Sequence, residues 1–149
     1  MQFALVNHIR IAYERRGSGV PLVLLHGFPL DHSIWELILP WIDNKADLIL
    51  PDLRGFGKSD GPDGTYTMEV LASDVFGILD YLKIAKAVIA GHSMGGYIAL
   101  AFARLYPDRL LGLGLISTQA TADTQERKSG RYETAESVEE RGVGRHYAT

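Results

Sequence analysis

The chain has 149 residues, 46% of them hydrophobic and 22% charged, which are the proportions of an ordinary soluble globular domain. A net charge of −3 and the lack of a lysine or arginine block give no electrostatic reason to expect nucleic acid or a membrane as a partner. Residues 1–8 lack the pattern of a secretory leader, and no apolar run could span a bilayer, so we expect a cytoplasmic protein. The absence of cysteine excludes a disulfide framework and a thiol nucleophile.

Six short apolar runs predict β-strands. The first two, residues 3–6 and 8–13, are expected to form a hairpin at one edge of a sheet. The other four are continuously apolar, as is typical of strands covered on both faces of a parallel sheet. These four runs are residues 22–25, 48–50, 87–90 and 110–116.

A first helix is predicted after the third strand. Ser33 and Glu36 fit a capping box, in which side chains bond backbone N–H groups of the first turn. Pro40 lacks an N–H group, so it should kink or end this helix. The apolar residues expected on its buried face are Ile34, Leu37, Ile38 and Trp41.

Two further helices follow from clearer periodicity. Apolar residues recur at helical spacing from a cap at Thr67 to Lys83. Residues 95–106 are apolar nearly all round and stop at Pro107, so this helix should be buried. The predicted order is β-β-β-α-β-α-β-α-β, an α/β fold whose mostly parallel sheet has helices on both faces.

The character of the chain changes after Ile116. Among the 33 residues that follow, 11 are charged, and no further run resembles a strand. Residues 131–141 fit a helix with little apolar surface. We therefore predict a core portion over residues 1–118 and a charged tail over 119–149.

A serine stands at a predicted sharp turn between an apolar strand and the buried helix. The pentad G-H-S-M-G over residues 91–95 fits the G-x-S-x-G nucleophile elbow, in which the turn exposes the central hydroxyl. Gly91 and Gly95 are required there because the strand and helix backbones cross closely. The helix N-terminus directs N–H groups toward Ser93 and stabilises an oxyanion, so Ser93 is the predicted nucleophile.

The loop after the third strand supplies the second part of this prediction. An oxyanion hole needs two donors, which we assign to the backbone N–H groups of Phe28 and Met94. Gly27 brings this loop close to the substrate carbonyl. For His26 we favour a hydrogen bond that holds the loop over a role as catalytic base.

Other motifs support neither phosphate nor metal binding. Gly57-Lys58-Ser59 resembles the end of a P-loop, but Asp52 occupies the position of the required first glycine. We interpret Asp52 and Arg54 as residues that fix a loop. The five histidines lack metal-ligand spacing, and His92 is expected to pack structurally, so no metal and no cofactor is predicted.

Three blocks together resemble the N-terminal part of an α/β-hydrolase fold protein of the esterase, lactonase and cofactor-free haloperoxidase type. The blocks are LHGFP over residues 25–29, PDLRGFGKSD over 51–60 and GHSMGG over 91–96. The resemblance covers residues 1 to about 118 and implies a fold truncated after about the sixth strand. The tail resembles the beginning of the family's variable cap or lid region.

The resemblance also implies a catalytic acid and a histidine that follow the serine along the chain. Asp123 and His146 are the only such pair in plausible order with a polar setting, although both lie in the cap-like tail. Two explanations stay open. We favour a fragment whose missing C-terminal half supplies both groups; the alternative is a short complete protein. Either would associate, with that half or as a homo-oligomer, to cover an edge strand.

These observations predict a serine hydrolase that acts on small carboxylic esters or lactones through an acyl-enzyme at Ser93. A cofactor-free perhydrolase, in which peroxide replaces water, is one alternative. A non-catalytic binding or assembly module that keeps the fold is another. Haloalkane dehalogenases and epoxide hydrolases of this fold need a carboxylate nucleophile, so Ser93 argues against both.

Overall fold

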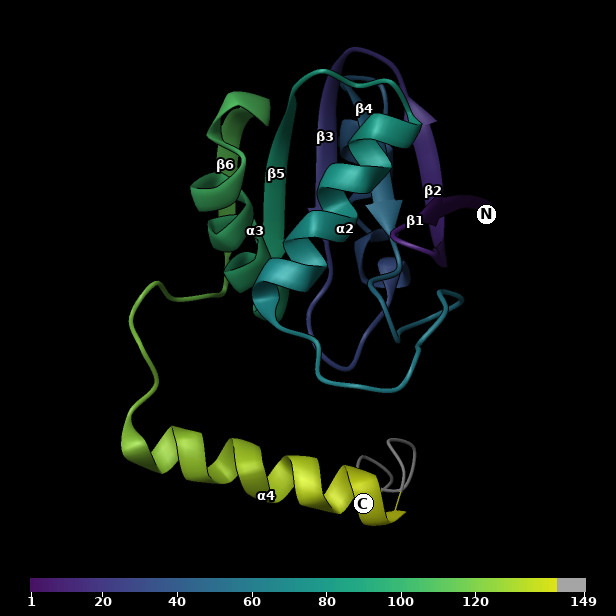
Figure 1. Cartoon of the computed structure of the whole chain (residues 1–149). Helices are drawn as coiled ribbons and strands as arrows, with labels where there is room; N and C mark the ends of the chain where they lie inside the picture. The colour runs from purple at the N-terminus through teal and green to yellow at the C-terminus, as the bar shows by residue number, and fades with distance from the viewer. Residues whose placement is uncertain (142–149) are drawn as a thin grey trace. The chain divides into compact units, whose positions relative to one another are not determined.

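A computed structural model describes residues 1–141, and the chain divides into two units after Gln119. The first unit contains a six-stranded sheet with the helices that pack on it (Figure 1). The described part of the second unit contains one helix, α4 (Gln125–Arg141), which begins before the predicted start at residue 131. No helix within residues 1–141 is long and apolar enough to cross a membrane.

The sheet is mixed and mostly parallel, as predicted. Its strand order is β1-β2-β4-β3-β5-β6. The first three of these pair antiparallel, whereas β3 pairs parallel with β4 and β5, and β5 pairs parallel with β6. The strands are β1 (Gln2–Val6), β2 (Ile9–Gly17), β3 (Val20–Leu25), β4 (Ala46–Pro51), β5 (Ala87–His92) and β6 (Leu110–Ile116).

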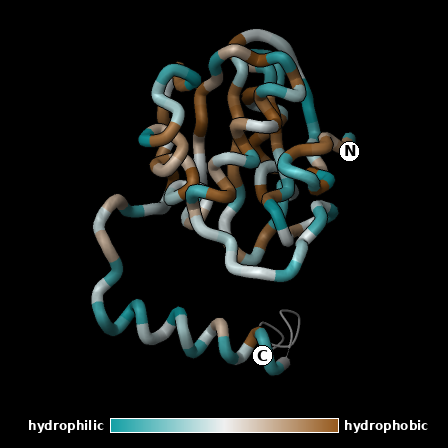
Figure 2. The backbone as a smooth tube through the Cα atoms, viewed as in Figure 1, coloured by the Kyte–Doolittle hydropathy of each residue, from teal (hydrophilic) through white to brown (hydrophobic). Residues whose placement is uncertain are grey.

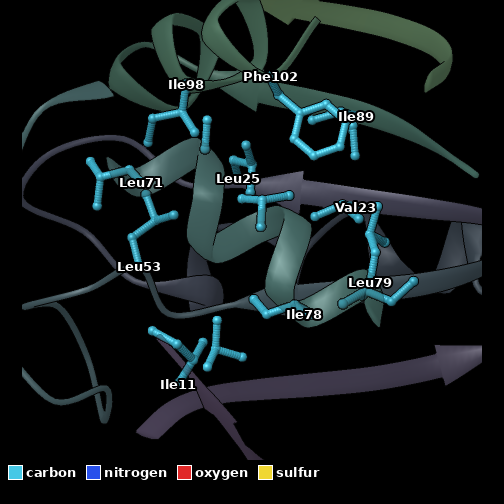
Figure 3. Close-up of a cluster of buried hydrophobic side chains, with 14 of the residues drawn as sticks. Ile11, Val23, Leu25, Leu53, Leu71, Ile78, Leu79, Ile89, Ile98 and Phe102 are labelled. Carbon is cyan, nitrogen blue, oxygen red and sulfur yellow. The ribbon is translucent and has the colours of Figure 1, made fainter. Parts of the chain in front are cut away.

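Two long helices cover one face of the sheet. Helix α2 (Met68–Tyr81) begins where the Thr67 side chain accepts a hydrogen bond from the Val70 N–H, which confirms the predicted cap. Helix α3 (Met94–Leu105) follows β5 directly and precedes a 3₁₀ turn, η2 (Pro107–Arg109). Figure 3 shows the larger apolar core between these helices and the sheet, with Val23, Ile78, Leu79, Ile89, Ile98 and Phe102 among its members.

The first predicted helix is wrong in its start and in its buried face. The structure has a 3₁₀ helix, η1 (His32–Trp35), and a separate short helix, α1 (Leu39–Ile42). Asp31 is the cap, because its carboxylate accepts the Ser33 N–H at 2.8 Å. Pro40 lies in the first turn of α1, where a missing N–H costs nothing. Two expected core residues, Leu37 and Trp41, are 88% and 74% exposed.

The last strand also departs from expectation. Its apolar sequence predicted burial on both faces, yet the leucines at 111, 113 and 115 are 53%, 39% and 45% exposed. The reason is that β6 is an edge strand, which pairs with no strand but β5 within the described residues. Figure 2 shows apolar strands inside the first unit and a mostly hydrophilic α4.

Candidate active site

Ser93 lies at the junction of β5 and α3 in a conformation that non-glycine residues rarely adopt. Its φ and ψ are 52° and −114°. The surrounding backbone holds it there. The Ser93 N–H donates to the Ile116 carbonyl at 3.0 Å, while the Ser93 carbonyl accepts from the Gly96 N–H (2.9 Å) and the Thr118 hydroxyl (2.8 Å). The sharp strand-to-helix turn expected of a nucleophile elbow is therefore present.

Steric crowding explains why the pentad has glycine at positions 91 and 95. A Cβ on Gly91 would overlap the Gly95 carbonyl, and a Cβ on Gly95 would overlap the Leu25 carbonyl. Both obstacles are backbone atoms, which cannot rotate away as a side chain would. At Gly91 this confirms the predicted close crossing of the strand and the helix, whereas at Gly95 the obstacle is the end of β3, which α3 approaches as closely.

The loop after β3 lies against the serine. A Cβ built on Gly27 would lie 3.2 Å from the Ser93 Cβ and 2.9 Å from His92 Nδ1. Glycine at 27 thus lets the loop approach the elbow. Phe28 is the next residue in this loop, and Met94 is the first residue of α3. Of the two residues assigned to an oxyanion hole, Phe28 therefore follows a glycine that lies near the serine, and Met94 follows the serine itself.

His26 holds this loop through both ring nitrogens. Its Nε2 accepts the Leu53 N–H at 2.9 Å, and its Nδ1 donates to the Gly27 carbonyl at 3.0 Å. The ring is fully buried, and burial lowers the pKa of the His26 imidazole from its usual 6.5. His26 is a neutral structural residue here, because neither nitrogen remains to accept a proton from a substrate or from Ser93.

The buried neutral ring gives a pH dependence of stability. Because the pKa of His26 is lower in the folded state, its stabilising contribution is complete above about pH 6.5 and is lost as the pH falls below that value. We expect His26→Gln, which keeps a donor and an acceptor, to flatten this fall by up to about 1.4 kcal/mol per pH unit. Urea unfolding from pH 5 to 8 measures the free energy of unfolding of both proteins. Identical slopes of that free energy against pH would contradict the assignment of His26 as a buried neutral residue.

The loop after β4 encloses a buried carboxylate rather than a phosphate. Asp52 Oδ1 accepts both the backbone N–H and the Nδ1–H of His32, at 3.0 and 2.6 Å, and Oδ2 accepts the Lys58 N–H at 2.8 Å. A Cβ on Gly57 would overlap this carboxylate. The glycine-rich sequence that resembled a P-loop therefore folds around Asp52, which fixes the loop as predicted.

Arg54 ties the same loop to α2. Its guanidinium makes two hydrogen bonds of 2.7 Å to the Asp74 carboxylate, and Asn7 Nδ2 donates to the same carboxylate at 2.8 Å. Both charged side chains are nearly buried, at 12% and 3% exposure. This pair is a structural connection between the strand ends and the helix layer.

Sequence reasoning did not group Asp31, His32 and Asp52, whose possible ligand atoms lie within 4.8 Å of one another. The available signal was that Asp31 and His32 follow β3 and Asp52 follows β4, which are neighbouring parallel strands. Each is occupied by protein contacts, since Asp52 binds His32 and hydrogen bonds from Ser33 lower the pKa of Asp31. The cluster is thus accounted for as an anchor of the two loops.

The structure does not test the acid and the histidine that were proposed from the sequence. Asp123 belongs to the second unit, where its carboxylate is ion-paired with Arg131. His146 lies outside the described residues. Within residues 1–141 no hydrogen bond joins the Ser93 hydroxyl to an imidazole. The base that would activate Ser93 therefore stays a prediction.

Comparison with known proteins decides the family. Residues 20–135, most of the chain, match the family described as alpha/beta hydrolase fold. The chain belongs to the α/β-hydrolase fold family. In this α/β-hydrolase chain, the strained serine, the crossing glycines and the adjoining loop occupy the elbow that the sequence predicted.

Similar proteins of known structure or annotation include several hydrolases. An esterase from Thermogutta terrifontis superposes with a TM-score of 0.86 and is 45% identical over 91% of this chain and 50% of its own. For the enol-lactonase from Burkholderia xenovorans LB400 the TM-score is 0.87, with 32% identity over 96% of this chain and 55% of that one. The soluble epoxide hydrolase of Corynebacterium sp. (strain C12) is 38% identical over 67% of this chain and 35% of its own length.

The chain thus spans about half the length of these solved relatives and about a third of the curated one. It corresponds to an N-terminal portion of the fold.

Proposed function

We propose that this α/β-hydrolase is a serine hydrolase of small carboxylic esters or lactones. The observation that carries the proposal is the strained Ser93, held between β5 and α3, with Gly27 so near that a Cβ on it would lie 3.2 Å from the Ser93 Cβ. A strained nucleophile that several hydrogen bonds keep in place is pre-organised for attack. An esterase and an enol-lactonase stand among the similar structures, which supports the substrate class.

In the proposed reaction, Ser93 Oγ bonds to the substrate carbonyl carbon as its proton passes to a base. The oxyanion that forms is held by the N–H groups of Phe28 and Met94, the latter at the N-terminus of α3, where helix N–H groups lack intrahelical acceptors. Collapse of the tetrahedral species expels the alcohol or the lactone oxygen, which takes up a proton. Water then cleaves the acyl-enzyme and restores the hydroxyl.

The residue at position 93 favours acyl transfer over epoxide opening, although epoxide hydrolases are among the similar proteins. A carboxylate that attacks an epoxide carbon forms an ester, which water can hydrolyse. A serine that attacked the same carbon would form an ether, which water does not cleave under these conditions. Of these two substrate classes, only the carbonyl class lets a serine nucleophile turn over.

For the base, we propose a histidine with its acid from a segment C-terminal to the region that the solved relatives share with this chain, because those relatives are about twice as long. The in-chain alternative is His146 with Asp123. In either arrangement the imidazole would take the Ser93 proton and return it to the leaving group.

A fluorophosphonate probe followed by intact-mass measurement tests the proposal. We expect one adduct on Ser93, formed more slowly where the proposed histidine is absent, abolished by Ser93→Ala and unchanged by Ser18→Ala, an exposed serine between β2 and β3. Substitution of a working catalytic histidine should slow labelling about 10²- to 10⁴-fold. An unchanged rate in His146→Ala excludes the in-chain pair, and no adduct on Ser93 would contradict reactivity of this chain.

A further inference from the structure

The segment at the end of β6 binds the backbone of Ser93 on both sides. The Ser93 N–H donates to the Ile116 carbonyl at 3.0 Å, and the Ser93 carbonyl accepts the Thr118 hydroxyl at 2.8 Å. Between these two partners, Ser117 has a φ of 46°, which non-glycine residues rarely adopt. Three consecutive residues far along the chain thus hold the amide and the carbonyl of the proposed nucleophile.

The Thr118 side chain has little freedom to turn away from that carbonyl. It lies against Gly96, in the first turn of α3, and a Cβ on Gly96 would overlap its Cβ, Oγ1 and Cγ2 alike. A β-branched side chain has few rotamers to begin with, and this close packing against the helix restricts them further. The hydroxyl is therefore held in its hydrogen bond to Ser93.

This hydrogen bond also bears on the next N–H along the chain. The Ser93 carbonyl and the Met94 N–H belong to one planar trans peptide group and point in opposite directions. Helical geometry does not set this group, because the ψ of Ser93 is −114°. Two donors hold its carbonyl, the Thr118 hydroxyl and the Gly96 N–H at 2.9 Å. Whatever fixes that carbonyl on one side aims the Met94 N–H on the other.

A donor on the carbonyl also strengthens the N–H of the same peptide group. Hydrogen bonds in a chain polarise one another, so a peptide whose oxygen accepts a hydrogen bond donates more strongly through its nitrogen. The Thr118 hydroxyl therefore affects both the direction and the strength of the Met94 N–H. That N–H is one of the two donors assigned to the oxyanion in the proposed reaction.

We propose that Thr118 is a positioning residue for the oxyanion hole. Its hydroxyl holds the peptide group between Ser93 and Met94 so that the Met94 N–H faces the oxyanion, and it acts through this peptide group and not on the substrate. The effect on rate rests on the proposed function, because it requires an oxyanion to form beside Ser93. The direction of the Met94 N–H does not depend on that chemistry and is measured separately.

The rate test compares two substitutions in the full 149-residue chain. Thr118→Val keeps the shape of the side chain and removes the hydroxyl, whereas Thr118→Ser keeps the hydroxyl. We expect Thr118→Val to lower the maximal rate of fluorophosphonate labelling about tenfold at an unchanged half-saturating probe concentration, because the donor acts on charge that develops only in the transition state. Thr118→Ser should stay within about threefold of the unsubstituted chain. Labelling that still reaches completion shows that the fold is kept.

Thr134→Val is the matched control. The Thr134 hydroxyl also donates to a backbone carbonyl, that of Gly130 in α4, at 2.9 Å. This substitution removes the same kind of hydrogen bond away from the elbow and should leave the labelling rate unchanged. A loss of rate as large as in Thr118→Val would overturn the inference.

The residual dipolar coupling of the Met94 N–H, measured by NMR, tests the geometry without any reaction. We expect this coupling to change in Thr118→Val and to keep its value in Thr118→Ser, whereas the couplings of Ile98 and Phe102, further along α3, stay constant in both. An unchanged Met94 coupling in Thr118→Val overturns the inference, and so does an unchanged labelling rate. A coupling that depends on the hydroxyl in a chain that forms no adduct on Ser93 would support the positioning and contradict the proposed hydrolase.

Discussion

Gly91→Ala is expected to destabilise the first unit by about 3 kcal/mol or more, because the new Cβ would overlap the Gly95 carbonyl. Relief would require β5 and α3 to separate at the elbow, which would also disturb Ser93. The free energy of unfolding from urea titration measures the first effect. The rate of fluorophosphonate labelling measures the second.

Gly112→Ala is the matched control. It introduces the same methyl group into a neighbouring parallel strand, where the nearest atoms belong to the Val88 side chain, 3.6 Å away. We expect a change within about 1 kcal/mol. Equal effects of the two substitutions would show that glycine is required in these strands for a reason other than the crossing of β5 and α3.

Asp74→Ala is expected to cost about 3–5 kcal/mol, because it leaves the Arg54 guanidinium nearly buried without its carboxylate. The loss also removes the shorter of the two hydrogen bonds that the Asn7 amide donates and leaves the one to the Ser73 hydroxyl. Urea unfolding measures the cost. The loop after β4 should lose order as well, which amide hydrogen exchange of Leu53 and Lys58 would detect.

The control for this pair is Glu69→Ala, which breaks the ion pair with Arg104. Those two side chains are 52% and 64% exposed, so solvent screens their attraction, and we expect a much smaller cost than for Asp74→Ala. Equal costs for the two substitutions would contradict a structural function of the buried pair.

Local sequence signals predicted those elements whose cause is local. Thr67 caps α2 through its own side chain, and the period of apolar residues in α2 and α3 follows from a helix that packs on one core. The elbow was predictable because two glycines at fixed offsets from a serine express one steric requirement. Strand runs in the middle of the sheet were predictable for the same reason, since burial on both faces demands continuous apolar sequence.

The segment after β3 was not predictable from its pattern. Ser33 and Glu36 fit the sequence pattern of a capping box. In the structure, however, the Asp31 carboxylate accepts the Ser33 N–H, and a 3₁₀ helix begins earlier, at His32. A cap at Ser33 and a cap at Asp31 both rest on a local bond between a side chain and the backbone, so the two starts differ little in energy. The hydrogen bonds from His32 to Asp52 favour the start at Asp31. The exposure of Leu37 and Trp41 follows from that choice.

The sequence by itself determined the α/β class, the order of the elements, the elbow at Ser93 and the loop that carries Phe28, because each is a pattern within one short segment. Only the tertiary structure decided that Asp52 binds His32, that Arg54 binds Asp74 and that β6 lies at an exposed edge. These depend on which strands become neighbours. Packing over the whole sheet decides which strands are neighbours. Residues far apart in the sequence therefore come into contact without any local sequence pattern that would predict it.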